Sequence, residues 1–168
     1  MKNHIIVTGG AGFVGSNLIE LLLKKTNKKI ISLDNYSTGK KKNHIFSKNQ
    51  RVKYLAGNTQ DINKKLNKIK NKIYFLFHFG EFSRIYQSFK EFDKFYDSNS
   101  IGSKAVFKFC LHNSIKLIYS ATSASLGNKG NDKNLSPYAF TKSKNLELLD
   151  NLKKWFNFKF EIIFFYNV

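Results

Sequence analysis

Residues 8–15, which read T-G-G-A-G-F-V-G, have the residue types and spacing of a phosphate-binding turn between a strand and a helix. Gly9 would permit the tight turn, Gly12 would let the backbone approach a pyrophosphate, and Gly15 would allow close packing of the helix on the strand. A glycine-rich turn can also be purely structural, so the flanking segments decide between the two interpretations.

The flanking segments support a dinucleotide site. An apolar strand precedes the turn and a helix follows it, so the amides of Phe13 and Val14 at the helix N-terminus would face the pyrophosphate. Asp34 closes the second predicted strand, where a carboxylate can accept hydrogen bonds from ribose hydroxyls. Because its charge would repel a 2′-phosphate, the pattern predicts NAD rather than NADP as the cofactor.

Tyr138 and Lys142 form a second candidate site. On a helix their side chains lie on one face a turn apart, and a nearby ammonium favours the phenolate form of a tyrosine. Such a tyrosine could take a proton from a sugar hydroxyl while hydride passes to a nicotinamide. The spacing alone proves little, because Tyr36 and Tyr86 also precede a lysine by four residues. Only Tyr138 opens a predicted helix directly after a strand that ends in hydroxyl residues.

Short apolar segments alternate with longer helical patterns, which predicts an α/β domain with a doubly wound parallel sheet of the Rossmann type. The predicted strands span residues 4–7, 30–34, 52–56, 73–78, 116–120 and 161–166. The predicted helices span about 12–25, 62–70, 95–113 and 138–156, and polar loops occupy 35–50 and 124–136. The side chains expected to face the sheet are Phe13, Leu18, Leu21 and Leu22 on the first helix, and Ile101, Ala105, Phe109 and Cys110 on the long one.

The chain is strongly basic, with 29 Lys and Arg against 11 Asp and Glu and a net charge of +18. Only Arg51 and Arg84 are arginines, and the lysines are spread over most predicted helices and loops. A nucleic-acid binder usually clusters its cations and uses arginine. We therefore attribute the charge to an A/T-rich coding sequence and predict no nucleic-acid partner, with nucleic-acid binding as the alternative. The charge would favour anionic ligands such as nucleotide sugars.

Other features bear on the compartment. Cys110 is the only cysteine, which excludes an intrachain disulfide and fits a reducing environment. No apolar run approaches the roughly 20 residues of a membrane span, and the N-terminal run is too short for a signal peptide. We expect a cytoplasmic protein without a membrane partner. No His, Cys, Asp or Glu cluster has the spacing of metal ligands, so no metal site is predicted.

Taken in order, these motifs resemble those of the extended short-chain dehydrogenase/reductases, in particular the NAD-dependent epimerase/dehydratase family. Residues 8–15 match T-G-G-x-G-F-I/V-G, and residues 136–142 match S-P-Y-x-x-S/T-K. Residues 120–127 are similar to S-S-S-x-x-V-Y-G, and Asn99 stands in the family's N-x-x-G. Residues 165–168 look like the end of R-x-x-N-V, so the resemblance runs through nearly all 168 residues.

The resemblance implies a set of site residues. Thr122 stands at the place of the catalytic Ser/Thr and would hydrogen-bond a substrate hydroxyl, Tyr138 would move its proton, and Lys142 would hold the nicotinamide ribose. The implied cofactor-binding residues are Gly9, Gly12, Phe13, Val14, Gly15, Asp34, Asn35, Asn58, Thr59, Phe79, Gly80, Asn99, Ser120, Tyr138, Lys142 and Tyr166. The implied substrate-binding residues are Glu81, Ser83, Thr122 and Asn167.

Three positions need comment against the family pattern. Asn58 replaces an aspartate in the segment that contacts adenine, which keeps an acceptor but loses the charge. Glu81 stands where the family usually has a small residue, beside the expected nicotinamide site. It would pair with Arg84, touch substrate or lie in solvent as a loop carboxylate. His78 is interpreted as a packing residue at a strand end rather than a base.

The resemblance implies an NAD-dependent nucleotide-sugar epimerase of the UDP-glucose 4-epimerase kind, acting through a keto-sugar intermediate. A dehydratase or reductase of the same family and a catalytically silent NAD-binding module are the alternatives. Family members continue for well over a hundred residues through a smaller domain that binds the sugar nucleotide. We therefore expect residues 1–168 to be the NAD-binding domain, with the substrate-binding domain missing or truncated. Members commonly dimerise, so a homodimer stays open.

Overall fold

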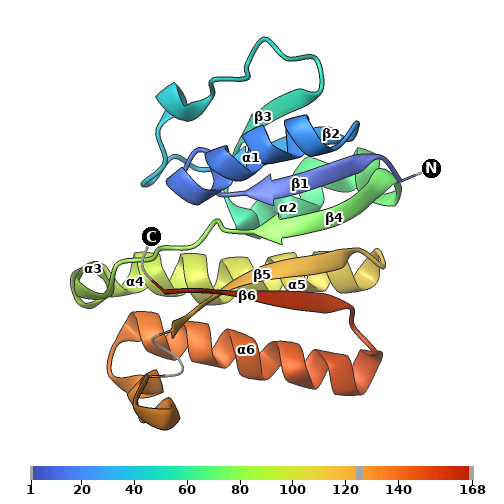
Figure 1. Cartoon of the computed structure of the whole chain (residues 1–168). Helices are drawn as coiled ribbons and strands as arrows, with labels where there is room; N and C mark the ends of the chain where they lie inside the picture. The colour runs from blue at the N-terminus through green and yellow to red at the C-terminus, as the bar shows by residue number, and fades with distance from the viewer. Residues whose placement is uncertain (1, 124–126, 167–168) are drawn as a thin grey trace.

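A computed structural model of the chain describes residues 2–123 and 127–166. Within these residues, six strands form one parallel sheet in the order β3-β2-β1-β4-β5-β6 (Figure 1). The strands are β1 His4–Thr8, β2 Lys29–Asp34, β3 Val52–Ala56, β4 Ile73–His78, β5 Lys116–Thr122 and β6 Phe160–Phe165. The predicted doubly wound sheet is confirmed, and the chain reverses its direction of winding between β1 and β4.

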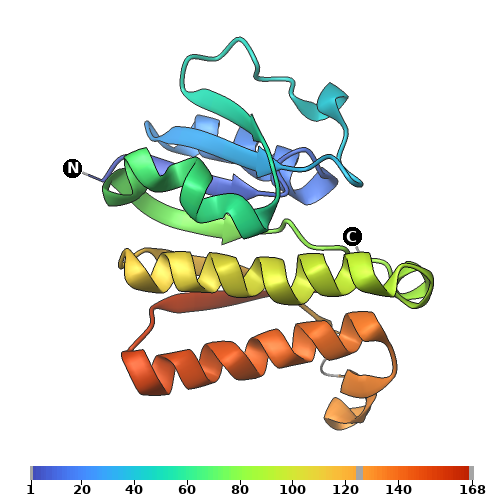
Figure 2. The same cartoon turned by 180° about the vertical axis from the view of Figure 1, so that it is seen from behind.

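The helices cover both faces of this sheet. They are α1 Phe13–Lys25, α2 Ile62–Leu66, α3 Ile85–Lys90, α4 Phe92–Tyr96, α5 Ser103–His112 and α6 Pro137–Phe156. A π-helical segment, η4 Asp97–Gly102, joins α4 to α5, and short 3₁₀ segments are η1 Lys41–Asn43, η2 Thr59–Asp61, η3 Asn67–Lys72 and η6 Gly127–Asn134. Figure 1 looks onto α1, whereas Figure 2 looks from behind onto α2 and α5.

Alternating side chains of the central strands supply two hydrophobic clusters. Ile5 and Val7 of β1 point to the α1 face, where they pack with Ile19, and Ile6 points to the opposite face. That second face holds the larger cluster, to which α2, α5 and α6 contribute, with Phe107 as one of its largest fully buried side chains. The side-chain period of two in a strand thus determines which residues meet which helix.

The edge strands differ from the centre. β2 is buried almost throughout, whereas β6 alternates between half-buried and exposed residues. β6 begins at Phe160, opposite Leu117, and ends at Phe165, opposite Thr122, so both of its ends lie one residue before the predicted bounds.

No helix in the described part of the chain is long and apolar enough to cross a membrane.

The predicted inner faces of two helices need correction. Leu22 is buried as expected, but Phe13 is 71% exposed and Leu21 51% exposed, and Ile19 and Leu23 face the sheet instead. On the long helix, Phe109 and Cys110 are buried, whereas Ile101 is 45% exposed. Ile101 lies nine residues before Cys110, and at about 100° per residue the two side chains fall on opposite sides of a helix.

Leu21 and Leu23 test directly which side of α1 faces the sheet. Leu23→Ala should lower the free energy of unfolding by about 2–4 kcal/mol, because it removes buried contacts and leaves a cavity. Leu21→Ala should change it by less than about 0.5 kcal/mol, since that side chain already lies mostly in solvent. Urea denaturation followed by circular dichroism measures both, and equal losses would contradict the observed orientation of α1.

Candidate dinucleotide-binding site

A pocket of about 280 Å³ opens at the carboxyl ends of the strands, beside the point where the winding reverses. Of the residues implicated by sequence, it is lined by Gly9, Gly12, Asp34, Asn35, Asn58, Thr59, Phe79, Gly80 and Glu81. Residues outside the implied set complete the lining: Leu33, Ser37, Thr38, Gly39, Gly57, Gln60, Phe82, Lys94, Asp97 and Ser98.

The turn after β1 requires glycine at two places. Gly9 has a φ of +72°, and a Cβ there would lie 2.5 Å from the carbonyl oxygen of Phe79 at the end of β4. A Cβ on Gly15 would collide with the Gly9 carbonyl, so only glycine lets α1 pack this close to the turn. The turn is therefore wedged between the ends of β1 and β4, and it aims the start of α1 at the pocket.

The start of α1 has the properties of an anion site. Gly12 is the N-cap, has no side chain to satisfy the first-turn amides, and lines the pocket. A Cβ on Gly12 would come only to 3.2 Å of Gly9 O, with open space otherwise. Because unsatisfied amides at the start of a 13-residue helix attract anions, the pocket presents a cradle for a phosphate group.

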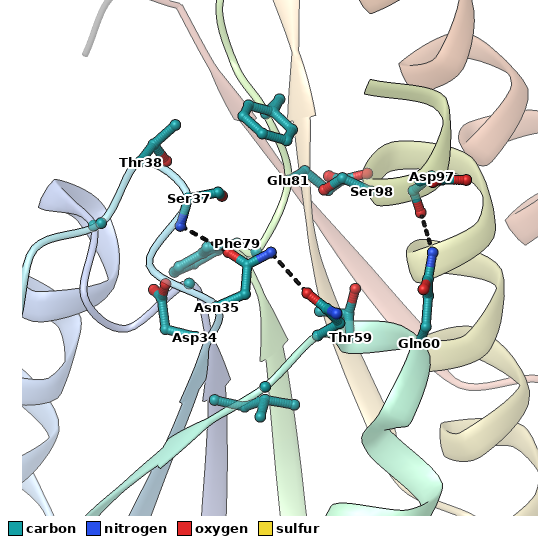
Figure 3. Close-up of a pocket in the computed structure, with 18 of the residues that line it drawn as sticks. Asp34, Asn35, Ser37, Thr38, Thr59, Gln60, Phe79, Glu81, Asp97 and Ser98 are labelled. Carbon is teal, nitrogen blue, oxygen red and sulfur yellow. Dashed lines mark hydrogen bonds between the residues drawn. The ribbon is translucent and has the colours of Figure 1, made fainter. Parts of the chain in front are cut away.

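The wall formed by β2 and β3 carries oxygen and amide groups. Asp34 is 8% exposed, and its two carboxylate oxygens accept from the amides of Ala11 at 2.9 Å and Tyr36 at 2.8 Å. Each oxygen keeps a lone pair for a further donor. Asn35 donates from Nδ2 to Asn58 Oδ1 at 2.9 Å across this end of the pocket (Figure 3). These groups could bind the hydroxyls of a ribose and the edge of a base.

Glu81 lies at the other end of the pocket, and its surroundings correct the sequence analysis. It neither pairs with Arg84 nor lies in solvent, because its side chain is only 2% exposed and forms an ion pair with Lys142. Its Oε1 accepts from Ser103 Oγ at 2.7 Å, Asn145 Nδ2 at 3.0 Å and Tyr119 OH at 3.1 Å. The carboxylate thus has donors on both oxygens although it is buried.

Lys142 is fixed as firmly as its partner. Its side chain is 5% exposed, and beyond the ion pair with Glu81 it donates to Ser120 O at 2.6 Å. The ammonium also lies 5.0 Å from the centre of the Tyr119 ring. This geometry places the positive charge beside the carboxyl end of β5, one helical turn after Tyr138 on α6.

His78 extends the polar network beneath the pocket. Its Nδ1 lies 2.7 Å from Thr8 Oγ1 and its Nε2 lies 2.9 Å from Ser103 Oγ. Since Ser103 gives its own proton to Glu81, Nε2 must donate to Ser103 and Thr8 must donate to Nδ1. Burial lowers the pKa of His78 to about 4, with Glu81 opposing and Lys142 reinforcing that shift. This neutral, enclosed ring fits the interpretation of His78 as a packing residue.

The start of α6 is set by a conventional cap. Ser136 Oγ accepts from the amide of Ala139 at 3.0 Å, and Pro137 occupies the first helical position. Tyr138 follows in the first turn and is 8% exposed, and Thr122 at the end of β5 is 7% exposed. Neither side chain lines the pocket, and both lie with Lys142 along the end of β5 and the start of α6.

The remaining implicated residues have other places. Asn99 is fully buried and bonds both the amide and the carbonyl of Phe82, so it supports the pocket wall from behind. Ser83 is exposed outside the pocket, and Tyr166 is 72% exposed after β6. Phe13, Val14, Gly15 and Ser120 do not line the pocket either. Asn167 lies outside the described residues.

Sequence reasoning missed three partners of Glu81. Asn145 follows Lys142 by three residues on the same helix face, and Ser103 follows Asn99 by four, so helical spacing could have indicated both. Tyr119 gives no such signal, because it lies in the buried strand β5, where packing alone accounts for an aromatic residue. Among the described residues, no group of three or more His, Cys, Asp or Glu could hold a metal ion.

The buried histidine predicts a pH effect on stability. The unfolded chain would protonate His78 below its ordinary pKa of 6.5, whereas the folded chain resists protonation down to about 4. The free energy of unfolding should therefore fall as the pH drops from 6.5 to 4, by roughly 3 kcal/mol from this residue. His78→Gln should lose less stability over the same interval, as measured by urea denaturation. Identical pH dependence in the variant would contradict the assignment.

Comparison with known proteins places the chain among relatives. A family model described as "NAD dependent epimerase/dehydratase family" matches residues 5–168. A dTDP-D-glucose 4,6-dehydratase of Dictyostelium discoideum is 34% identical over 77% of this chain and 32% of its own length. A UDP-glucose 4-epimerase of Streptococcus mutans is 22% identical over 98% of this chain and 51% of its own.

Solved structures share the fold. The UDP-glucose 4-epimerase from Brucella ovis in complex with NAD superposes with a TM-score of 0.85 at 20% identity, over 98% of this chain and 52% of that one. A dTDP-glucose 4,6-dehydratase from Streptomyces venezuelae, with NAD and TYD bound, gives 0.87 at 19% identity, over 96% and 55%. The chain thus spans about half the length of these structures. Because the family model matches nearly the whole sequence, the chain belongs to the NAD-dependent epimerase/dehydratase family.

Proposed function

We propose that residues 1–168 form the NAD-binding domain of a nucleotide-sugar 4-epimerase of the UDP-glucose 4-epimerase kind. The observation that carries the proposal is the pocket itself, which joins an uncapped helix start at Gly12 to the carboxylate of Asp34. At the opposite end it reaches Glu81, the ion-pair partner of Lys142.

We infer that NAD would bind along this pocket. Gly12 and the first turn of α1 would hold the pyrophosphate, because a side chain is absent where the phosphates approach. Asp34 would accept from the hydroxyls of the adenosine ribose, and Asn58 and Thr59 would lie beside the adenine. Phe79 and Gly80 would then line the nicotinamide end.

The chemistry would divide between the cofactor and the chain. NAD, when bound, would accept a hydride from the sugar and return it. Tyr138 would take and give back the proton of the sugar hydroxyl, and Thr122 would hydrogen-bond that hydroxyl. Lys142 would keep a positive charge next to Tyr138, and its burial would shield that charge from water.

A second candidate is an NAD-binding module without catalysis. The observation that favours it is the ion pair, which ties Lys142 to Glu81 and so reduces the net charge that Lys142 offers to Tyr138. A dehydratase of the same family is the nearest enzymatic variant, as one relative with 34% identity carries that name.

Cofactor choice tests the binding part of the proposal. The chain should bind NAD more tightly than NADP, because Asp34 would repel a 2′-phosphate. Asp34→Asn should weaken NAD binding by roughly tenfold and narrow the preference over NADP. Isothermal titration calorimetry measures both affinities. Asp150→Asn, an exposed carboxylate on α6, is the matched control and should change neither. Equal affinity of the unmodified chain for NAD and NADP would contradict the role of Asp34.

Turnover tests the catalytic part. Tyr138→Phe should slow the interconversion of UDP-glucose and its 4-epimer by at least about a hundredfold while leaving NAD affinity nearly unchanged. Tyr86→Phe is the matched control, since Tyr86 has the same spacing to a lysine but is 70% exposed. Binding of NAD with no turnover of any UDP-, GDP-, CDP- or ADP-sugar would instead favour the silent module.

A further inference from the structure

Glu81 and Lys142 form a buried ion pair next to the pocket. Glu81 lines the pocket, and its carboxylate is held by Lys142, Ser103, Tyr119 and Asn145. All four of these partners donate to the carboxylate oxygens. The exposed fractions of the two side chains, 2% and 5%, show that water screens neither charge well.

The pair carries no net charge, because the negative charge of Glu81 offsets the positive charge of Lys142. The end of the pocket next to the pair therefore has no net charge from these two residues. Lys142 alone would place a positive charge beside the ends of β4 and β5. Glu81 cancels that charge, and it is the member of the pair whose residue lines the pocket, although its side chain is only 2% exposed. Thr8 and His78 add no charge, because the threonine is neutral and the histidine is held neutral by burial.

The position of the pair identifies the part of a ligand that would sense it. The lining of the pocket includes Asp34 and Asn58, Gly12, and Phe79 and Glu81. A dinucleotide with its pyrophosphate at Gly12 and its adenosine ribose at Asp34 brings its other base to Glu81. This step rests on the proposed function, in which that base is nicotinamide.

The nicotinamide ring is cationic in NAD⁺ and neutral in NADH, and the two forms are otherwise nearly the same shape. We propose that Glu81 determines how this site discriminates between the two redox forms. Its carboxylate stabilises the cationic ring and offsets the repulsion from Lys142, so the site retains NAD⁺ rather than favouring NADH. Glu81 is in this sense a specificity residue for the oxidised cofactor.

The test is the ratio of the dissociation constants of NAD⁺ and NADH, measured on the 168-residue chain by calorimetry. Glu81→Gln keeps the shape and removes the negative charge, so the ratio Kd(NAD⁺)/Kd(NADH) should rise by roughly three- to tenfold. Lys142→Met removes the positive charge and should lower the ratio. The double variant is neutral again and should return close to the unmodified value.

The controls separate charge from packing. Glu147→Gln makes the same change in net charge on the exposed surface of α6 and should leave the ratio unchanged. Circular dichroism checks that each variant folds. If Glu81→Gln does not fold, Lys142→Met and the double variant still give different predictions, a lowered ratio for the first and an unchanged ratio for the second.

Two results would overturn the inference, and they are distinguishable. If Glu81→Gln weakens NAD⁺ and NADH by the same factor, Glu81 acts only as a structural support, and the NAD site itself stands. If the unmodified chain binds neither dinucleotide, the proposed function fails and the inference fails with it.

Discussion

The architecture of the site depends on one close contact, that of the Gly9 backbone with the end of β4. Gly9 donates to Leu33 O at 2.9 Å and has no room for a side chain against Phe79, so three neighbouring strands meet at this residue. The contact fixes the turn after β1, and the turn fixes the direction of α1. The uncapped start of that helix and the carboxylate of Asp34 then face the same pocket. The tight packing of Gly9 against Phe79 therefore brings the polar groups of the pocket together.

Beneath this turn, a continuous set of polar contacts joins elements distant in sequence. Thr8 of β1 bonds His78 of β4, which bonds Ser103 of α5, which bonds Glu81, and Glu81 pairs with Lys142 of α6. Each donor has an acceptor and the proton directions all point toward the carboxylate, so the burial of these groups costs little unsatisfied hydrogen bonding. The same contacts that hold the sheet to its helices thus also hold the charged groups of the site.

Much of this fold could be predicted from sequence because buried parallel strands are apolar and glycine has few substitutes at a tight turn. Residues 8–15, Asp34 and the strand bounds carry that information locally. One error is local. Ile101 lies nine residues before the buried Cys110, and at about 100° per residue this spacing puts the two on opposite sides of a helix. The other error arises where geometry is not local. The partner of Glu81 could not be predicted, since 61 residues separate it from Lys142 and only the fold brings them together.

The buried pair also constrains how this sequence can evolve. Loss of either charge alone leaves the other uncompensated in a dry environment, which is far more harmful than loss of both. A lineage that loses Glu81 while it keeps Lys142 must therefore balance the charge of the lysine in another way. A small residue at position 81 would go with a lysine whose charge is balanced elsewhere, by solvent or by a bound ligand.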